Sequence, residues 1–396
     1  MFLKFILKKS LSIFFSIIKI FIRKKNYIII QSYNPYSYSE NSKYLFEYMS
    51  RHQSHKFKIY WNTNSKIISN FLKKKNLNYI NIKKNPLKFL YIFLSAKIII
   101  DSGTKFLDFL GLASSDLKVL KICIYHGGGP KLMPISKKIT KERQKNIQDH
   151  KAFNFINFPS SFVKNKCQKN FDLDVNKVLS LGYPRCDQFF KKKKKKIFKY
   201  ITGHDKHNSK VILYTPTWRG YKYSFPLNYM KGINYNNLNN FLKKNDLFFF
   251  YSCHPNQKNK NIPLKFSRIK FINIKKLPFY DTNEFLNEVD LLLNDYSASS
   301  TDFVILKKPQ IFFIPDYKRY DNHQGFLDNY KKNLIGPEVN SMTGLKKKIL
   351  KYSNSPKEYN NEFRLKIKNY TKKYYNLSIK NSSKLLKDFV VSKLDY

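Results

Sequence analysis

The chain has 396 residues, of which 42% are hydrophobic and 17% aromatic, so it can build buried cores and intrinsic disorder is disfavoured. Its length exceeds the roughly 250 residues at which a single core stops growing, which predicts two domains. Seventy-five Lys and Arg residues against 26 Asp and Glu give a formal net charge of +49. A polyanionic partner would suit this charge, but Lys, Asn, Ile, Tyr and Phe are frequent everywhere in the chain, so charge alone selects no partner.

The first 25 residues predict an amphipathic helix that lies on a membrane surface. Lys4, Lys8 and Lys19 interrupt the apolar run too often for a membrane span, which needs about 20 apolar residues. At about 100° per residue, most of the polar side chains fall on one stripe of the helix. We therefore expect residues 1–25 to bind anionic headgroups at the cytoplasmic face of the cell membrane. A signal peptide, disfavoured by the lack of a small-residue cleavage site, and a helix docked on the protein's own core are the alternatives.

The remainder of the chain predicts two series of βαβ units with parallel sheets. After Asn26, short β-branched and aromatic runs alternate with longer, lysine-rich amphipathic segments. The first series of predicted strands spans residues 27–31, 57–61, 97–101, 119–125, 153–157 and 178–181. The second series spans residues 211–214, 247–252, 270–274, 290–293 and 310–314.

The domain boundary is expected at a run of lysines. Six consecutive lysines, Lys191 to Lys196, cannot be buried. We predict a first α/β domain over residues 26–190, a lysine-rich linker over 191–209 and a second α/β domain over 210–345. Residues 346–396 have a helical pattern without a further strand.

The cysteines indicate neither a metal site nor a disulfide framework. Cys123, Cys167, Cys186 and Cys253 have neither CxxC nor Cys/His spacing. We interpret them as reduced thiols in a cytoplasmic protein, and we expect no metal and no cofactor.

Four polar clusters directly follow predicted strands. In open parallel sheets, ligands bind beyond the carboxyl ends of the strands. One such cluster would mean little, but four together predict an active site. They are IYHGGGPK with His126, YTPTWRG with Thr217 and Arg219, CHPN with His254, and NDYSASSTDF with Asp295 and three serines.

The last of these clusters predicts a phosphate site at the start of a helix. Ser299 and Asp302 have the S-x-x-D spacing of a capping box, so a helix is expected to begin there. Its unpaired N–H groups and the hydroxyls of Ser297, Ser299 and Ser300 can donate to a phosphate. The alternative is that these residues only cap the helix, and for Asp295 taken alone we favour capping.

Thr217 and Arg219 are expected to contribute to the same phosphate site. The guanidinium fork of Arg219 suits a diphosphate, although an arginine after a strand is often part of a surface ion pair. Taken together with the serines, Arg219 favours phosphate binding.

His126 and His254 are candidates for proton transfer. Each lies in the turn after an apolar run, where a single histidine is more often structural than catalytic. Two of them in one cleft would favour catalysis, because one can take a proton from an attacking hydroxyl and the other can support a leaving phosphate. Gly127 and Gly128 would let a substrate approach the backbone.

Other motifs with a known chemistry are absent or weak. HGGG also occurs in the oxyanion loop of lipases, but the chain has no G-x-S-x-G elbow. Neither a G-x-x-x-x-G-K-[ST] loop nor a G-x-G-x-x-G fingerprint occurs. Asp172 and Asp174 form a D-x-D, which we interpret as structural.

The assembled motifs resemble those of the CDP-glycerol glycerophosphotransferase family, whose members prime or polymerise teichoic-acid and related polyol-phosphate chains. The similarity runs through SYSENSKYLFEYM, IYHGGGPK, GYPRCD, YTPTWR, CHPN, NDYSASSTDF, KKPQIFFIPDYKRY and the GF at Gly325 and Phe326, so it covers most of the chain. The sequence departs from the family pattern at Gly128 and Gly129, where Thr and Pro are usual, at Ala298, which replaces a serine, and at Cys186, which replaces an asparagine.

This resemblance implies a GT-B fold, in which two Rossmann-like domains face each other across a cleft. The first domain would hold the acceptor and the second the CDP-activated donor, with the helices of residues 346–396 packing back on the first domain. By the same resemblance, His126 is the base and His254 supports the donor phosphates. Gly127, Gly128, Lys131, Arg185 and Asp295 are expected to line the same cleft.

The expected reaction is transfer of a polyol phosphate, glycerol phosphate first of all, from a CDP-polyol to a hydroxyl of a lipid-linked or polymeric acceptor, with release of CMP. This would make a teichoic-acid-like or other cell-surface polymer. We expect no nucleic-acid partner. The alternatives are a GT-B glycosyltransferase that uses a nucleotide sugar and a non-catalytic basic protein that binds polyanions.

Overall fold

The computed structural model divides the chain into two compact units. It describes residues 17, 22–103, 119–132, 141–191, 197–217, 219, 226–252, 266–272, 281–375 and 379–394. Unit 1 comprises Met1–Gly127, Ile139–Gln188 and Tyr375–Tyr396, and unit 2 comprises Gly128–Lys138 and Phe189–Tyr374. The chain therefore first passes from unit 1 to unit 2 between Gly127 and Gly128, one residue after His126. The predicted amphipathic segment 1–25 lies almost entirely outside the described residues.

Unit 1 contains a seven-stranded sheet in the order β3-β2-β1-β4-β5-β6-β7, and every pairing in it is parallel. The strands are β1 (Lys25–Gln31), β2 (Lys58–Asn62), β3 (Tyr79–Ile80), β4 (Ala96–Asp101), β5 (Leu120–Cys123), β6 (Phe155–Asn157) and β7 (Val178–Leu179). The helices are α2 (Glu40–Arg51), α3 (Lys66–Lys74), α4 (Pro86–Ser95), α6 (Lys141–Lys151), α7 (Ser161–Phe171) and α16 (Ser382–Ser392). The strand order places the carboxyl ends of β4 and β5 beside each other, near the middle of the sheet.

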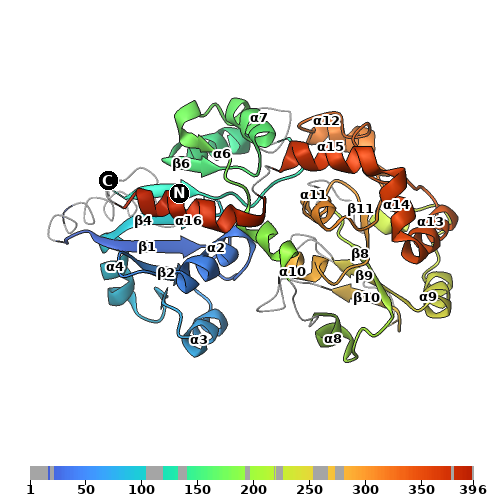
Figure 1. Cartoon of the computed structure of the whole chain (residues 1–396), viewed down its shortest axis with the longest axis horizontal. Helices are drawn as coiled ribbons and strands as arrows, with labels where there is room; N and C mark the ends of the chain where they lie inside the picture. Colours follow the sequence, from blue (N-terminus) through green and yellow to red (C-terminus); the bar gives the residue numbers. More distant parts are fainter. Residues whose placement is uncertain are drawn as a thin grey trace. The chain divides into compact units, whose positions relative to one another are not determined.

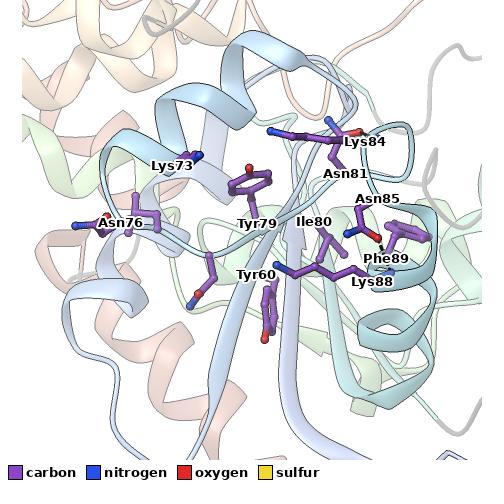
Figure 2. Close-up of a pocket in the computed structure, with 12 residues that line it drawn as sticks. Tyr60, Lys73, Asn76, Tyr79, Ile80, Asn81, Lys84, Asn85, Lys88 and Phe89 are labelled. Atoms are coloured by element: carbon purple, nitrogen blue, oxygen red, sulfur yellow. Dashed lines mark hydrogen bonds between the residues drawn. The ribbon is translucent and has the colours of Figure 1, made fainter.

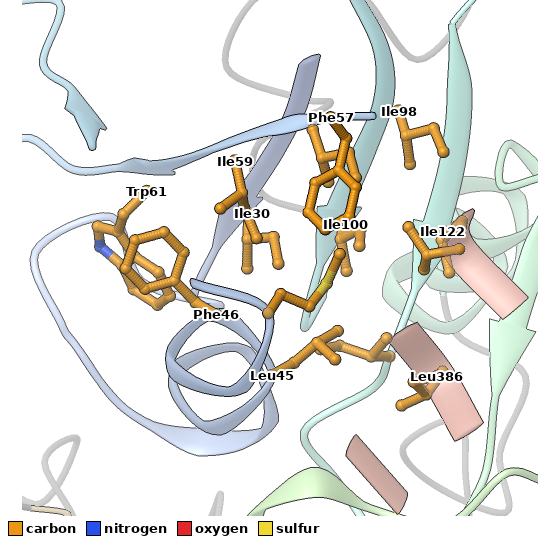
Figure 3. Close-up of a cluster of buried hydrophobic side chains, with 14 of the residues drawn as sticks. Ile30, Leu45, Phe46, Phe57, Ile59, Trp61, Ile98, Ile100, Ile122 and Leu386 are labelled. Carbon is orange, nitrogen blue, oxygen red and sulfur yellow. The ribbon is translucent and has the colours of Figure 1, made fainter. Parts of the chain in front are cut away.

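The main core of unit 1 lies between the sheet and the pair α2 and α16, which lie side by side (Figure 1). Side chains of alternate strand residues point to this face, as Ile28 and Ile30 do from β1. Figure 3 shows Leu45 and Phe46 of α2 and Leu386 of α16 packed against Ile and Trp side chains of the strands. Helix α4 covers the opposite face with Phe89, Ile92 and Phe93. Helices on both faces explain why the strands read as nearly continuous apolar runs.

Unit 2 contains a five-stranded parallel sheet in the order β10-β9-β8-β11-β12. The strands are β8 (Lys210–Tyr214), β9 (Leu247–Ser252), β10 (Ile269–Ile272), β11 (Leu291–Asn294) and β12 (Gln310–Phe312). The helices are α8 (Ile197–Thr202), α9 (Tyr235–Lys244), α10 (Thr282–Leu286), α11 (Ala298–Phe303), α12 (Tyr317–His323), α13 (Met342–Asn354), α14 (Pro356–Glu362) and α15 (Arg364–Tyr374). The predicted α/β class with two parallel sheets is confirmed.

All eleven predicted strands are present within a few residues of their expected bounds, and β3 is the strand that the sequence did not predict. The segment expected as a lysine-rich linker contains α8, because Ile197 and Phe198 are apolar enough to join the core of unit 2. The carboxylate of Glu288 accepts hydrogen bonds from the backbone N–H groups of both residues, each at 2.9 Å. Of the expected C-terminal helices, α13, α14 and α15 belong to unit 2 and α16 to unit 1.

Among the residues that the structure describes, no helix combines the length and the apolar character that crossing a lipid bilayer requires.

Helix α16 is fixed to unit 1 by the GYPRCD motif. The carboxylate of Asp187 accepts hydrogen bonds from the backbone N–H groups of Ser382 (3.0 Å) and Ser383 (2.8 Å) at the start of the helix. Gly182 has a φ of +83°, and a Cβ atom there would lie 2.3 Å from the Ser382 hydroxyl. The motif therefore joins the end of the chain to the first sheet by close backbone approach and by a carboxylate at a helix N-terminus.

Replacing Asp187 by alanine should lower the free energy of unfolding by about 1–3 kcal/mol, because two buried N–H groups lose their acceptor. Urea denaturation followed by circular dichroism measures this. Asp205→Ala is the control, since Asp205 pairs with Lys199 on the surface and both side chains are 58% exposed. An equal response of the two variants would show that Asp187 does not hold α16.

Candidate active site

His126 lies directly beyond the carboxyl end of β5, where the backbone takes an uncommon conformation. Strand β5 ends at Cys123, and Tyr125 has a φ of +42°, in the left-handed region that a bulky residue rarely adopts. Such a conformation costs on the order of 1–3 kcal/mol and is found most often at functional sites. The turn at Tyr125 brings the His126 ring against the ring of Tyr33, with a centroid distance of 4.3 Å.

One ring nitrogen of His126 is committed to a backbone carbonyl. Its Nδ1 lies 2.8 Å from the carbonyl oxygen of Ser102, which follows the neighbouring strand β4. Because a carbonyl only accepts, Nδ1 carries a proton in this arrangement, and in the neutral ring Nε2 then carries the lone pair. The Ser102 hydroxyl is itself 2.5 Å from the Ser42 hydroxyl of α2. The neighbouring strand therefore sets the tautomer that a general base needs.

The loop around His126 is held by buried side chains of unit 1. The amide of Asn41 donates to the carbonyls of Ile124 (3.1 Å) and Tyr125 (2.6 Å). The guanidinium of Arg185 donates to the carbonyl of His126 at 2.8 Å, and the Tyr183 hydroxyl donates to the carbonyl of Gly127. Arg185, a predicted site residue, thus fixes the backbone at His126, and Tyr183 fixes it at Gly127, another predicted site residue.

The glycines that follow His126 enter unit 2. Gly128 opens this segment. The N–H of Leu132 donates to the carbonyl of Gly325 at 3.0 Å, and the N–H of Leu327 donates to the carbonyl of Pro130 at 2.7 Å. Gly129 has a φ of +104°, and a Cβ atom there would lie 2.9 Å from the hydroxyl oxygen of Thr301 and 3.2 Å from the Cα atom of Ala298. The lack of a side chain at Gly129 therefore lets this loop pack against α11.

Arg219 occupies a buried cluster of charges at the carboxyl ends of β8, β11 and β12. Its Nη1 donates to Asp295 at 2.8 Å and to the carbonyl of Thr217 at 2.9 Å. Its Nε and Nη2 donate to the carboxylate of Asp316 at 2.6 and 2.9 Å. The side chains of Arg219, Asp295 and Asp316 are 1%, 0% and 5% exposed. Both carboxylates are acceptors for this one guanidinium, a fork geometry that lysine cannot reproduce.

Asp295 organises the backbone of two strand ends as well as pairing with Arg219. Its carboxylate accepts from the N–H of Thr217 (2.9 and 3.0 Å) and from its neighbour Tyr296 (2.6 Å). The expected capping by Asp295 is therefore wrong: its oxygens bind the β8 loop and Arg219, not the start of α11.

The charges of this cluster act on two cationic groups. Burial opposes the charged form of Arg219, but Asp295 and Asp316 outweigh that effect and raise the pKa of its guanidinium. Burial, aided by the positive charge of Arg219, lowers the pKa of Lys131 to about 8 despite the opposing charge of Asp295. Lys131 is held beside the cluster by a bridge to Phe326. Its ammonium group can therefore gain or lose a proton near neutral pH.

Hydroxyl groups that can form further hydrogen bonds lie at the same strand ends. The side chain of Thr217 is buried, and its hydroxyl oxygen has no hydrogen-bond partner among the described residues. Ser297 and Ser299 are half-buried, and their hydroxyls lie 3.3 Å apart. A buried hydroxyl without a partner costs stability unless a ligand or water satisfies it, so the Thr217 hydroxyl has capacity to bind one or the other.

The cap of α11 differs from the predicted one. The helix begins at Ala298, and its N-cap is Ser297, whose hydroxyl accepts from the N–H of Ser299 at 3.4 Å. Asp302, expected in a capping box with Ser299, instead accepts from Asn283 at 2.8 Å. Ser300 is turned into the sheet, where its hydroxyl donates to Gln310 at 2.7 Å. Ser297 and Ser299 are thus the serines with accessible hydroxyls.

The predicted site residues fall into two groups. His126, Gly127 and Arg185 meet in unit 1, whereas Lys131, Thr217, Arg219, Asp295 and the serines belong to unit 2. His254 lies outside the described residues. Within the part of the chain that the structure describes, no three His, Cys, Asp or Glu side chains gather in a way that could hold a metal ion.

Sequence reasoning did not find the partners that fix these groups. Asp316 follows β12 in the segment KKPQIFFIPDYKRY. Its position after a strand could have placed it with the four polar clusters that follow other strands. Asn41, Ser102 and Tyr183 carried no such signal, because they act on backbone atoms distant in sequence.

Comparisons with known proteins find relatives that match most of the chain. The chain is 26% identical over 363 residues to the teichoic acid glycerol-phosphate primase of Bacillus subtilis (strain 168), covering 89% of this chain and 90% of the relative. It is 26% identical over 355 residues to the teichoic acid glycerol-phosphate transferase of Staphylococcus aureus (strain NCTC 8325 / PS 47), covering 85% and 86%. Among solved structures, a variant of the wall teichoic acid polymerase TagF has a TM-score of 0.77 at 20% identity, covering 98% of this chain and 94% of that one.

A further TagF variant, soaked with CDPG, has a TM-score of 0.71 at 19% identity, covering 94% of this chain and 90% of that one. At these identities the structures show a shared fold. The sequence itself matches the family described as CDP-Glycerol:Poly(glycerophosphate) glycerophosphotransferase over residues 13–392. The chain therefore belongs to the CDP-glycerol:poly(glycerophosphate) glycerophosphotransferase family, which confirms the resemblance of its motifs.

Proposed function

We propose that this chain transfers glycerol phosphate from CDP-glycerol to a hydroxyl of a lipid-linked or polymeric acceptor and releases CMP. The observation that carries the proposal is the fixed tautomer of His126, whose Nδ1 is committed to Ser102. Family membership supplies the class of reaction, and the relatives' names supply the teichoic-acid setting.

The proposed chemistry assigns each bond change to a group. Nε2 of His126 takes the proton of the acceptor hydroxyl, whose oxygen attacks the phosphorus that bears the glycerol. The bond from this phosphorus to the bridging oxygen breaks, and that oxygen leaves as part of CMP. Catalysis then rests on positioning and on stabilising the charge that develops on the phosphates.

The donor phosphates are assigned to the strand ends of unit 2. The unpartnered hydroxyl of Thr217, the accessible hydroxyls of Ser297 and Ser299, and the ammonium group of Lys131 are the proposed donors. Arg219 takes a supporting role, because four of its hydrogen bonds go to Asp295, Asp316 and a carbonyl. His254 stays a predicted phosphate ligand.

One member of each group, His126 and Lys131, lies in the same short loop, which supports their joint action. His126 is the last residue but one of the first segment of unit 1, and Lys131 lies in the segment of unit 2 that follows. Four residues lie between them, so the five Cα-to-Cα steps limit the distance between their Cα atoms to about 18 Å. A cleft between two Rossmann-like domains, the GT-B arrangement, stays a prediction.

We also propose attachment to the cytoplasmic face of the cell membrane. Support comes from the amphipathic pattern of residues 1–25 and from the teichoic-acid relatives. A lipid-linked acceptor would be reached from that surface.

The donor and the base are tested together by nucleotide release. The wild-type chain should release CMP from CDP-glycerol with a lipid-linked acceptor, and His126→Ala should lower kcat/KM by about 10²–10⁴-fold, the usual contribution of a general base. Donor affinity should stay unchanged in this variant, as measured by calorimetry. CDP-ribitol and a panel of UDP-sugars serve as competing donors. Release of UDP from a sugar donor in place of CMP, or near-normal activity of His126→Ala, would contradict the proposal.

The supporting role of Arg219 is tested by stability. Arg219→Met should lower the free energy of unfolding by about 3–5 kcal/mol, because two buried carboxylates lose their partner. Lys145→Met removes the surface pair with Asp149 and should cost only about 0.3–0.5 kcal/mol. Urea denaturation compares them, and a small loss in Arg219→Met would rule out the buried cluster.

The pH dependence of donor binding tests Lys131. With its pKa lowered to about 8, Lys131 is charged below that pH and neutral above it. The affinity for CDP-glycerol should therefore be constant below pH 7 and fall as the pH rises from 7 to 9. Lys131→Arg keeps its charge throughout this range and should flatten the fall in a calorimetric titration. An identical pH profile for both proteins would exclude Lys131 from the donor site.

A further inference from the structure

A cavity of about 480 Å³ lies at the open edge of the first sheet, and none of the predicted site residues lines it. It spans the short edge strand β3, between the end of α3 and the start of α4. Figure 2 shows Lys73 and Asn76 on one side of β3 and Lys84, Asn85 and Lys88 on the other. Tyr60 and Phe89 form part of its wall. Three exposed lysines and four asparagines are thus among the residues that line this one cavity.

The positive charge around this cavity is not balanced by acidic residues nearby in the sequence. Between Glu47 and Asp101 the chain contains ten lysines and no Asp or Glu, and this stretch includes every residue that lines the cavity. The lining itself contains no carboxylate. A space lined by cations without acidic residues fits an anion rather than a neutral or cationic ligand.

Two of the lysines occupy positions that are electrostatically unfavourable when no anion is bound. Lys84 and Lys88 flank the first turn of α4, which contains no acidic residue. The N-terminal end of a helix carries partial positive charge, so lysines there are repelled, whereas Lys73 in the last turn of α3 is favourably placed. An anion in the cavity would remove the repulsion at Lys84 and Lys88.

Next to the cavity, α4 exposes apolar side chains to solvent. Leu87 is 80% exposed and Tyr91 is 44% exposed, and their spacing of four residues places them on one side of the helix. The ammonium group of Lys25 lies 5.3 Å from the centroid of the Tyr91 ring. An apolar stripe with tyrosine, bordered by lysines, is the composition of surfaces that lie in a membrane interface.

The predicted membrane-binding segment joins the fold at the same helix. Ile22 packs on the core beneath α4, and the ammonium group of Lys24 donates to the carbonyls of Leu94 (3.1 Å) and Ala96 (2.9 Å) at the C-terminal end of α4. Ile22 and Lys24, at the end of the predicted membrane-binding segment, therefore lie against α4, the helix that exposes Leu87 and Tyr91.

We propose that this cavity binds the phosphate headgroup of an anionic phospholipid, while Leu87 and Tyr91 insert into the membrane interface. Lys73, Lys84 and Lys88 would hold the phosphate as point charges, and the asparagine amides would donate hydrogen bonds to its oxygens. The proposal deepens the proposed membrane attachment by naming a lipid site within unit 1, and it does not depend on the transfer reaction.

The first experiment compares two triple variants of the full chain on vesicles. Lys73→Gln/Lys84→Gln/Lys88→Gln removes the cavity lysines, and Lys243→Gln/Lys244→Gln/Lys347→Gln removes the same charge from exposed positions on α9 and α13. On vesicles of phosphatidylglycerol and phosphatidylcholine, the cavity variant should partition about 10–100-fold more weakly than wild type, the effect expected of three lysines at an anionic surface. The control variant should bind like wild type. Equal losses in both variants, or no loss in the cavity variant, would overturn the proposal.

Two further measurements separate this site from a structural role and from a site for free phosphate. The thermal midpoint of the cavity variant should change little, because relief of the repulsion at Lys84 and Lys88 offsets the loss of the favourably placed Lys73; a clear fall would indicate a structural role and overturn the proposal. Glycerol phosphate at millimolar concentration should neither stabilise the wild type nor displace it from vesicles. Stabilisation by glycerol phosphate with unchanged vesicle binding would assign the cavity to a soluble phosphate instead.

The apolar part of the proposal has its own variant. Leu87→Ser should weaken binding to the anionic vesicles several-fold without changing its dependence on salt, because Leu87 contributes apolar area and no charge. Unchanged binding of Leu87→Ser would exclude α4 from the interface. Transfer to a soluble acceptor should be normal in all these variants, whereas His126→Ala should bind vesicles normally, so the two proposals fail separately.

Discussion

Unit 2 of this protein depends on one buried ion cluster, in which the guanidinium of Arg219 joins the carboxylates of Asp295 and Asp316. Removing three charges from water is costly, and the cost is offset only because nearly every donor and acceptor finds a partner at 2.6–3.0 Å. The cluster connects the ends of β8, β11 and β12, so it sets the positions of Thr217 and Ser297 before any ligand arrives. A preorganised site of this kind needs little rearrangement when the charge on a phosphate develops.

His126, the proposed base, is positioned by a different means, through hydrogen bonds to backbone carbonyls. Asn41, Tyr183 and Arg185 bind four consecutive carbonyls from Ile124 to Gly127, while Ser102 binds the ring of His126. These bonds compensate the unfavourable φ of Tyr125 and leave the ring with a defined proton position. The glycines that follow then carry the chain into unit 2, so that the proposed base and the proposed phosphate ligand Lys131 share one short loop.

Much of the fold could be predicted because parallel strands buried on both faces leave a strong apolar signal in sequence, as in Ile98 to Ile100. Strand β3 has only two residues and gives no such signal. The positions of His126, Thr217 and Arg219 after strands were also predictable, because strand ends determine them. Their partners were not: Asp316 is 97 residues from Arg219 and Ser102 is 24 residues from His126, and no local pattern connects them. The cap of α11 was misplaced because several successive polar residues, from Ser297 to Asp302, offer more than one cap, and only packing decides between them.

The central claim is that Arg219 keeps its two carboxylates while Thr217, Ser297 and Lys131 contact the donor. A crystal structure of the chain with CDP-glycerol bound tests it most directly. The account predicts phosphate oxygens within hydrogen-bond distance of the Thr217 hydroxyl and the Lys131 ammonium group, with the Arg219–Asp295 and Arg219–Asp316 pairs intact. A guanidinium that has left these carboxylates to bind the diphosphate itself, or a nucleotide bound away from these strand ends, would contradict it.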